Sequence, residues 1–232
     1  MNIKIFADGA DLNGMLEEYK KGVVSGFTTN PSLMKKAGIT SYKEFVKEVV
    51  ENINMPVSFE VFSDDFDGMR REAQELSKLG DNIYVKIPVT NTKGESTVSL
   101  IEELSERGYK LNITAVFTVD QVKKILSALR FGTPSIISVF AGRIADAGVD
   151  PEAIMKESKE LCERVSGVDL LWASCRELYS IIQAEEIGVD IITVQNSLLK
   201  KLNLLGKDLE EYSLETVRGF YKDASGLGFT IL

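Results

Sequence analysis

The chain has 232 residues, of which 44% are hydrophobic and 27% are charged, a composition typical of a soluble globular protein. Its net charge of −8 argues against nucleic acid or an anionic membrane surface as a partner, so a phosphorylated ligand would need a local basic pocket. No apolar run approaches the roughly 20 residues that span a bilayer, and the first residues lack a signal-peptide pattern. We therefore expect a cytoplasmic protein with no membrane partner.

Two residue types narrow the chemistry. Cys162 and Cys175 are the only cysteines and form no CxxC pair, which favours a reduced compartment without structural disulfides or zinc. The sequence contains no histidine, which excludes Ser-His-Asp and Cys-His catalysis and the common histidine-based zinc sites. Acid–base chemistry must then use carboxylates, lysine, tyrosine, threonine or water.

Short apolar runs alternate with amphipathic helical patterns along the whole chain. Eight runs predict strands, at residues 4–8, 26–30, 57–61, 84–89, 111–117, 135–142, 170–174 and 190–195. Helical periodicity is clearest over residues 12–19, 42–49 and 122–129. Helices are expected to begin after the caps Asp11, Ser41 and Asp150, the last followed by Pro151 at the first helical position. They are expected to end at the glycines Gly22, Gly80, Gly108 and Gly188.

This alternation predicts a single (β/α)8 barrel domain over residues 1–232, close to the roughly 250 residues that such barrels typically contain. An open doubly wound sheet is less favoured, because no GxGxxG loop follows the first run. Residues 205–232 form an extra C-terminal helical extension with an apolar face: Leu214, Val217, Phe220 and Tyr221. This helix could close the barrel bottom, cover its mouth or dock on a neighbouring copy.

Lys86 is the most informative residue, because it lies inside the apolar run from Tyr84 to Thr90. A lysine buried in a parallel strand loses hydration, which lowers its pKa and makes a free amine available near neutral pH. Such an amine can attack a ketone or aldehyde to form a Schiff base. The alternative is a lysine that reaches solvent or pairs with one carboxylate.

Polar residues also gather at the carboxyl ends of the predicted strands, where barrel enzymes have their active sites. They are Asp8, Asn30, Glu60, Lys86, Asn112, Thr114, Ser138, Arg143, Ser174 and Arg176. An unpaired buried polar group costs about 1–3 kcal/mol, so an array of them is unfavourable inside a packed core. The array is better explained by a charged pocket that contains water. Asp8 and Glu60 could serve as bases, Thr114 could hold a water, and the two arginines with Ser138 and Ser174 could bind a phosphate.

Each of these residues also has a structural interpretation. Asp8 could cap a loop, and Asn30-Pro31 could form a turn. Arg143 could pair with Asp146 three residues on, and Arg176 could pair near Glu177 or cap a carbonyl. Cys175 is best explained as a small packed hydrophobe.

The combined pattern resembles the transaldolase family, and most closely its small branch that includes fructose-6-phosphate aldolase. Segments that carry the resemblance lie in family order across about residues 4–200: FAD at 6–8, TTNPSL at 28–33, VSFEV at 57–61, VKIPVT at 85–90, NIT at 112–114, SVFAGR at 138–143 and ASCR at 173–176. The pair TTNPSL and VKIPVT is the specific part of this match.

The resemblance implies a Class I aldolase-type enzyme without metal or cofactor. It implies that Lys86 forms the Schiff base with a ketose phosphate, that Asp8 moves the proton of the cleaved bond's hydroxyl, and that Glu60 and Thr114 assist through a water. The remaining residues would bind substrate: Asn30, Thr29 and Asn112 the dihydroxyacetone part, and Ser138, Phe140, Arg143, Ser174 and Arg176 the rest with its phosphate. It further implies a homopentamer or homodecamer built through the C-terminal helix.

Glu60 and Phe140 separate the reactions of the family, since its transaldolases carry glutamate and phenylalanine where the aldolases carry glutamine and tyrosine. This chain therefore resembles a transaldolase, which transfers dihydroxyacetone from fructose 6-phosphate to erythrose 4-phosphate and yields sedoheptulose 7-phosphate in the pentose phosphate pathway. An aldolase that releases free dihydroxyacetone, and a silent sugar-phosphate-binding protein, are the alternatives.

The chain also departs from the family pattern, chiefly at the phosphate end and the rim. Gly9 follows the aspartate, Val139 and Ala141 flank Phe140, Ala145 replaces a usual acid, and Glu177 follows Arg176. These departures leave the tail group of the substrate open, and a sulfonated ketose is a further alternative.

Overall fold

The computed structural model describes residues 2–229 and 231, which fall into two compact units that meet between Leu199 and Lys200 in the sequence. The first unit is a closed barrel of eight parallel strands in sequence order. The strands are β1 (Lys4–Asp8), β2 (Gly26–Thr28), β3 (Val57–Glu60), β4 (Ile83–Pro88), β5 (Leu111–Val116), β6 (Ser135–Val139), β7 (Val168–Trp172) and β8 (Ile191–Gln195). The predicted (β/α)8 barrel is therefore confirmed.

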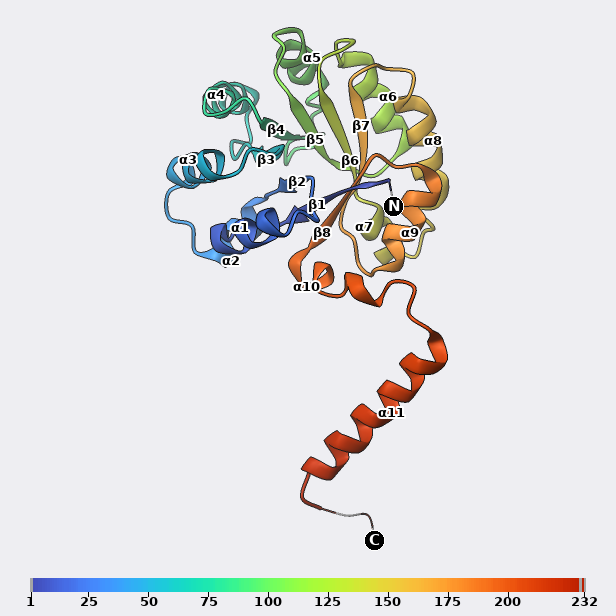
Figure 1. Ribbon diagram of the computed structural model, residues 1–232. Helices are drawn as coiled ribbons and strands as arrows, with labels where there is room; N and C mark the ends of the chain where they lie inside the picture. Colours follow the sequence, from blue (N-terminus) through green and yellow to red (C-terminus); the bar gives the residue numbers. More distant parts are fainter. Residues whose placement is uncertain (1, 230, 232) are drawn as a thin grey trace. The chain divides into compact units, whose positions relative to one another are not determined.

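Helices surround the barrel strands on the outside (Figure 1). They are α1 (Leu12–Lys21), α2 (Pro31–Ala37), α3 (Tyr42–Asn52), α4 (Phe66–Ser77), α5 (Val98–Glu106), α6 (Val119–Ala128), α7 (Ala141–Asp146), α8 (Glu152–Cys162), α9 (Tyr179–Ile187) and α10 (Asn196–Leu199). The second unit contains a 3₁₀ turn (Leu202–Leu204) and α11 (Leu209–Gly226). The prediction of one domain with a C-terminal extension stays a prediction.

Most of the predicted helix ends are correct to within a residue or two. The side chain of Asp11 caps α1 by accepting from the Gly14 amide, whereas Ser41 precedes α3 without a capping hydrogen bond. Gly22 and Gly188 end α1 and α9 in the left-handed conformation, where glycine is favoured.

Three observed helix boundaries lie one or two residues from the expected positions. Helix α8 begins at Glu152 rather than at Pro151, which itself occupies the cap position, while Asp150 accepts from the Glu152 amide. Lys78 ends α4 before Gly80, and Arg107 ends α5 one residue before Gly108. Gly108 still ends α5 as expected, since it is left-handed (φ 80°) and its amide donates to the Ser105 carbonyl, whereas Gly80 lies two residues beyond the cap of α4.

One predicted strand also proves too long, because residues 135–142 contain two elements. Strand β6 ends at Val139, the backbone turns at Phe140 (φ −83°, ψ 58°), and α7 starts at Ala141. The apolar run continues through the turn because both elements are buried. The turn brings Phe140 and Arg143 to the barrel mouth.

Alternation along the strands separates an apolar layer from a polar one. Phe6, Ile136 and Ile191 belong to a buried apolar cluster, and two residues further along the same strands stand Asp8, Ser138 and Thr193. Side chains two apart on a strand point to the same side, so the polar layer lies toward the carboxyl ends. Register adds to this arrangement, since Glu60 pairs with Lys86 across β3 and β4.

Candidate active site

A cavity of about 500 Å³ opens at the carboxyl ends of the strands. All the predicted site residues except Thr29 and Asn112 line it: Asp8, Asn30, Glu60, Lys86, Thr114, Ser138, Phe140, Arg143, Ser174 and Arg176. They lie on or shortly after every strand but β8, which contributes Thr193 and Gln195. The topology of the barrel thus collects residues that are up to 187 positions apart in the sequence, from Asp8 to Gln195.

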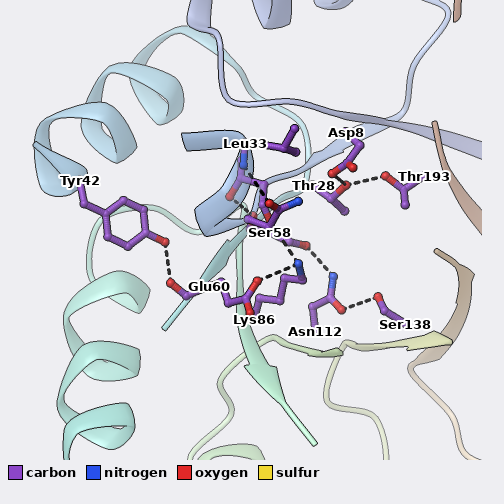
Figure 2. Close-up of polar contacts among 12 residues, drawn as sticks. Asp8, Thr28, Leu33, Tyr42, Ser58, Glu60, Lys86, Asn112, Ser138 and Thr193 are labelled. Carbon is purple, nitrogen blue, oxygen red and sulfur yellow. Dashed lines mark hydrogen bonds and ion pairs between the residues drawn. The ribbon is translucent and has the colours of Figure 1, made fainter. Parts of the chain in front are cut away.

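Lys86 lies at the centre of the polar contacts in this cavity (Figure 2). Its residue is only 6% exposed, as predicted, and its Nζ donates to Glu60 Oε2 at 2.9 Å and to the Thr29 carbonyl at 3.1 Å. The lysine is therefore paired with one carboxylate, the alternative considered from the sequence. The free amine can arise here by transfer of one proton to Glu60, the adjacent base.

The backbone of Glu60 is held in place from outside the barrel. The Tyr42 hydroxyl on α3 donates to the Glu60 carbonyl at 2.8 Å, and its ring stacks on Phe62 at a centroid distance of 4.4 Å. Burial raises the pKa of Tyr42, with the Glu60 charge acting in the same direction, so this phenol remains a donor. The contact helps fix the carboxylate of Glu60 beside Lys86.

Asp8 is the second carboxylate of the cavity, at the end of β1. The Thr28 hydroxyl donates to Asp8 Oδ1 at 3.0 Å, and it shares a second hydrogen bond with the Thr193 hydroxyl (Figure 2). Burial raises the pKa of Asp8, while the Lys86 charge and the Thr28 hydrogen bond oppose that shift. Asp8 is therefore a buried carboxylate suited to accept a proton, and not a loop cap.

Sequence reasoning missed Thr28 and Thr193, since threonine is an ordinary strand residue. The available signal was their position, because each is the polar residue of a short apolar run near its carboxyl end. Gln195, the last residue of β8, also lines the cavity and was missed, although it too is a polar residue at the carboxyl end of an apolar run.

Thr29 and Asn112, both fully buried, lie behind the cavity wall instead of lining it. The Asn112 amide donates to Ser58 Oγ at 2.9 Å and accepts from Ser138 Oγ at 2.7 Å, so it ties β3, β5 and β6 together. Thr29 donates its hydroxyl to the Ser58 carbonyl at 2.8 Å. Asn30 lines the cavity and also caps α2 by accepting from the Leu33 amide at 3.0 Å, so the turn and the site occur together.

Strand β5 presents Thr114 through a local irregularity. Its register against β6 shifts between Ile113 and Val116, and Ala115 adopts a left-handed φ of 59°. Among the described residues, the buried hydroxyl oxygen of Thr114 has no hydrogen-bond partner. Because a buried hydroxyl without a partner is unfavourable, this group is suited to hold a water or a substrate oxygen.

The far end of the cavity is cationic. The Arg143 guanidinium lies 5.2 Å from the Phe140 ring centroid, and Ser174 lies nearby with a left-handed φ of 61°. Arg176 forms two hydrogen bonds with Asp146, so Asp146 pairs across to the β7 side and not with Arg143 on its own helix. This end can bind an anionic group.

Cysteine reactivity, metal binding and membrane insertion can each be judged from the described residues. Burial raises the pKa of the Cys175 thiol to about 11, which fits the packed thiol expected from the sequence. Within residues 2–229 and 231, no three His, Cys, Asp or Glu side chains are grouped so that they could hold a metal ion. No described helix is long and apolar enough to cross a membrane.

The fold and the site define a barrel protein whose cavity has a buried lysine, two carboxylates and an end lined by two arginines. The family model of transaldolase and fructose-6-phosphate aldolase matches residues 5–231. The chain is thus an enzyme of the transaldolase/fructose-6-phosphate aldolase family.

Curated relatives agree with this assignment. A protein of Thermoanaerobacter sp. (strain X514) named "Probable transaldolase" is 37% identical over 201 residues, which cover 86% of this chain and 89% of the relative. Proteins of the same name from Carboxydothermus hydrogenoformans and Methanococcus maripaludis (strain C7) are also 37% identical, with 86% of this chain and 90% and 89% of theirs covered. The predicted family membership is confirmed.

A solved structure with the same fold is titled as that of "a putative phosphonomutase" from Burkholderia cenocepacia J2315. The alignment has a TM-score of 0.57 and covers 96% of this chain and 93% of that one. At 12% identity the likeness shows the barrel fold alone.

Proposed function

We propose that this enzyme is a metal-independent transaldolase, which transfers a dihydroxyacetone unit from fructose 6-phosphate to erythrose 4-phosphate and so yields sedoheptulose 7-phosphate. The observation that carries the proposal is Lys86, a buried amine 2.9 Å from Glu60 in the cavity that also contains Asp8. A binding protein would gain nothing from an amine and two carboxylates kept together at a cost in desolvation.

The reaction begins when Glu60 takes a proton from the Lys86 ammonium. The free amine adds to the C2 carbonyl of the ketose, and loss of water, assisted by Glu60 and a water held by Thr114, leaves a protonated imine. Asp8 then removes the proton of the C4 hydroxyl. The C3–C4 bond breaks, its electron pair moves toward the imine nitrogen, and an aldose phosphate leaves.

The second half runs in reverse with a new aldehyde. The enamine carbon attacks the carbonyl of erythrose 4-phosphate, Asp8 returns its proton to the new hydroxyl, and water releases the product from Lys86. Asn30 and Ser138 orient the dihydroxyacetone part, and the buried Asn112 and Thr29 support them from behind the cavity wall, Asn112 by accepting from Ser138 Oγ. Arg143, Ser174 and Arg176 hold the phosphate of either substrate.

Phe140 explains why the fragment waits for an acceptor. It lines the cavity where a tyrosine hydroxyl could protonate the enamine and release free dihydroxyacetone. Phenylalanine has no such proton, which favours transfer over release. The reaction belongs to the pentose phosphate pathway in the cytoplasm, and we propose that α11 joins copies of the chain into a homopentamer or homodecamer.

Product analysis tests this function. Fructose 6-phosphate is supplied with and without erythrose 4-phosphate, and a seven-carbon ketose phosphate is expected only when both are present. Free dihydroxyacetone without the acceptor would identify an aldolase instead. Borohydride should trap the donor on the wild type and not on Lys86→Met, and a failure to trap any ketose would favour a silent binding protein.

A further inference from the structure

The anionic end of the substrate would meet two arginines in different electrostatic states. Arg176 Nε donates to Asp146 Oδ1 at 3.2 Å, and Arg176 Nη2 donates to Asp146 Oδ2. The carboxylate thus occupies one edge of the planar guanidinium in a two-point contact. Asp146 neutralises the charge of Arg176 at the rim of the cavity.

Arg143 is different. Within the part of the chain that the structure describes, no carboxylate lies within 4.0 Å of its guanidinium, which instead sits over the Phe140 ring. A guanidinium over an aromatic face keeps its hydrogen-bond donors available at its edge. Arg143 is therefore the arginine of this pair that is ready to meet an anion.

The balance of charge at this end follows from these contacts. Arg143, Arg176 and Asp146 together carry one net positive charge. A phosphate monoester carries about −1.5 to −2 at pH 7, so it would remain partly uncompensated. A sulfonate carries a single negative charge and would be matched.

We propose that Asp146 is a specificity-determining residue, which tunes this end of the cavity toward a singly charged tail group, such as a sulfonate, over a doubly charged phosphate. The inference rests on the proposed transfer reaction in assigning the substrate's anionic group to this end, and it deepens that function by predicting that a ketose with a singly charged tail is bound at least as tightly as fructose 6-phosphate. Side chains of Asp146 and Arg176 are 50% and 45% exposed, so the pair adds little to folding and can be altered without loss of the barrel.

Two small probes isolate the effect of charge. The dissociation constants of methyl phosphate and methanesulfonate are measured by ligand-observed NMR on the full chain at pH 7.5. The wild type should bind methanesulfonate at least as tightly as methyl phosphate. Asp146→Asn should tighten methyl phosphate about fivefold, which corresponds to about 1 kcal/mol for one like charge removed near the surface, and should change methanesulfonate less than about twofold.

A matched control and two arginine variants sharpen the test. Asp150→Asn makes the same change in net charge outside the cavity and should leave both constants unchanged. Arg143→Gln should weaken both probes strongly, and Arg176→Gln should weaken them much less. Equal tightening of both probes in Asp146→Asn, losses of equal size in the two arginine variants, or a wild type that binds neither probe would overturn the proposal.

Borohydride trapping of fructose 6-phosphate on the same preparations separates this inference from the proposed function. If the wild type traps no ketose while the probe constants shift as expected, the function fails and the inference holds. If trapping succeeds while the probe ratio is unchanged in Asp146→Asn, the inference alone fails.

Discussion

Asp8, the base of the proposed mechanism, is a buried carboxylate whose ionisation lowers stability. Burial raises its pKa above the value of 3.8 that holds in an unfolded chain. The folded state then binds the proton more tightly, so stability falls as the pH rises through the interval between the two pKa values. At neutral pH the ionised carboxylate destabilises the fold while remaining ready to act as a base.

Asp8→Asn should therefore be more stable and far less active. We expect a Tm above that of the wild type at pH 7, because the variant has no buried carboxylate to ionise. The gain should shrink as the pH falls through the interval between the two pKa values and vanish well below 3.8, where Asp8 is protonated in both states. Transfer activity should fall about 10²–10⁴-fold with the loss of the base. If the variant melts below the wild type at pH 7, the attraction between the Lys86 charge and the Asp8 carboxylate outweighs the desolvation of Asp8.

In the proposed mechanism Glu60 accepts the proton of Lys86, so its removal should delay formation of the imine. In Glu60→Gln we expect borohydride trapping at pH 7 to slow about 10²-fold, because the ammonium has lost its adjacent base. The deficit should shrink toward pH 9, where hydroxide can deprotonate the lysine. The control is Glu75→Gln, an exposed carboxylate with the same change in charge. Wild-type trapping rates in Glu60→Gln would exclude this role.

Single residues were predictable from the sequence where their type conflicts with their surroundings. Lys86 in an apolar strand is such a conflict, and its burial followed. Its ion pair with Glu60 was one of two open choices, because the pairing depends on the register of β3 against β4. The Asp146–Arg176 pair was out of reach, since it spans 30 residues whereas sequence spacing suggested a partner three residues away.

The turn from β6 into α7 is an element in which one glycine is essential. A Cβ atom at Gly142 would lie 1.7 Å from the backbone oxygen of Ser174, whose own backbone is left-handed. This close approach lets the start of α7, which carries Arg143, lie beside the segment after β7 that carries Arg176, and the Gly142 amide donates to the Ala173 carbonyl at 3.2 Å. Neither side of the contact is a flexible side chain, so a larger residue must displace a backbone.

Gly142→Ala should therefore destabilise the barrel by about 1–3 kcal/mol and raise the KM for fructose 6-phosphate more than it lowers kcat. Urea denaturation followed by tryptophan fluorescence measures the first effect, since Trp172 lies in the adjacent β7. Gly219→Ala in α11, where a Cβ meets nothing within 4 Å, is the control and should cost no stability. An unchanged KM in a folded Gly142→Ala protein would argue against this role of the contact.

Elements were predictable where burial gives a simple pattern. Parallel strands buried on both faces appear as apolar runs, so all eight were found. Their ends were less certain, as the run over residues 135–142 shows, because burial continues through the turn into α7. The irregularity in β5 left no signal, since Ala115 gives no hint of a left-handed backbone.

The molecule divides its parts between the two units. The barrel unit contains the cavity, and the second unit contains the long helix α11. Val217 and Phe220 on α11 are 58% and 69% exposed, and Leu214 and Tyr221 on the same face are exposed as well. Large exposed apolar faces mark interaction surfaces. A second copy of the chain presents the same apolar face. We therefore propose that the face of α11 packs against another copy of this chain.

Val217→Glu/Phe220→Glu should therefore break the assembly and leave the chemistry intact. Light scattering after gel filtration should give a pentamer or decamer for the wild type and a mass near 25.7 kDa for the variant. Two glutamates on a buried apolar contact would each need desolvation, which a thin helix interface cannot offset.

The control, Thr216→Glu/Lys222→Glu, adds charge away from this face and should keep the assembly. Borohydride trapping should persist in both variants, because Lys86, Glu60 and Asp8 all belong to the first unit. A wild type that elutes as a monomer would contradict the proposed role of α11, as would an unaltered oligomer in the Val217→Glu/Phe220→Glu variant.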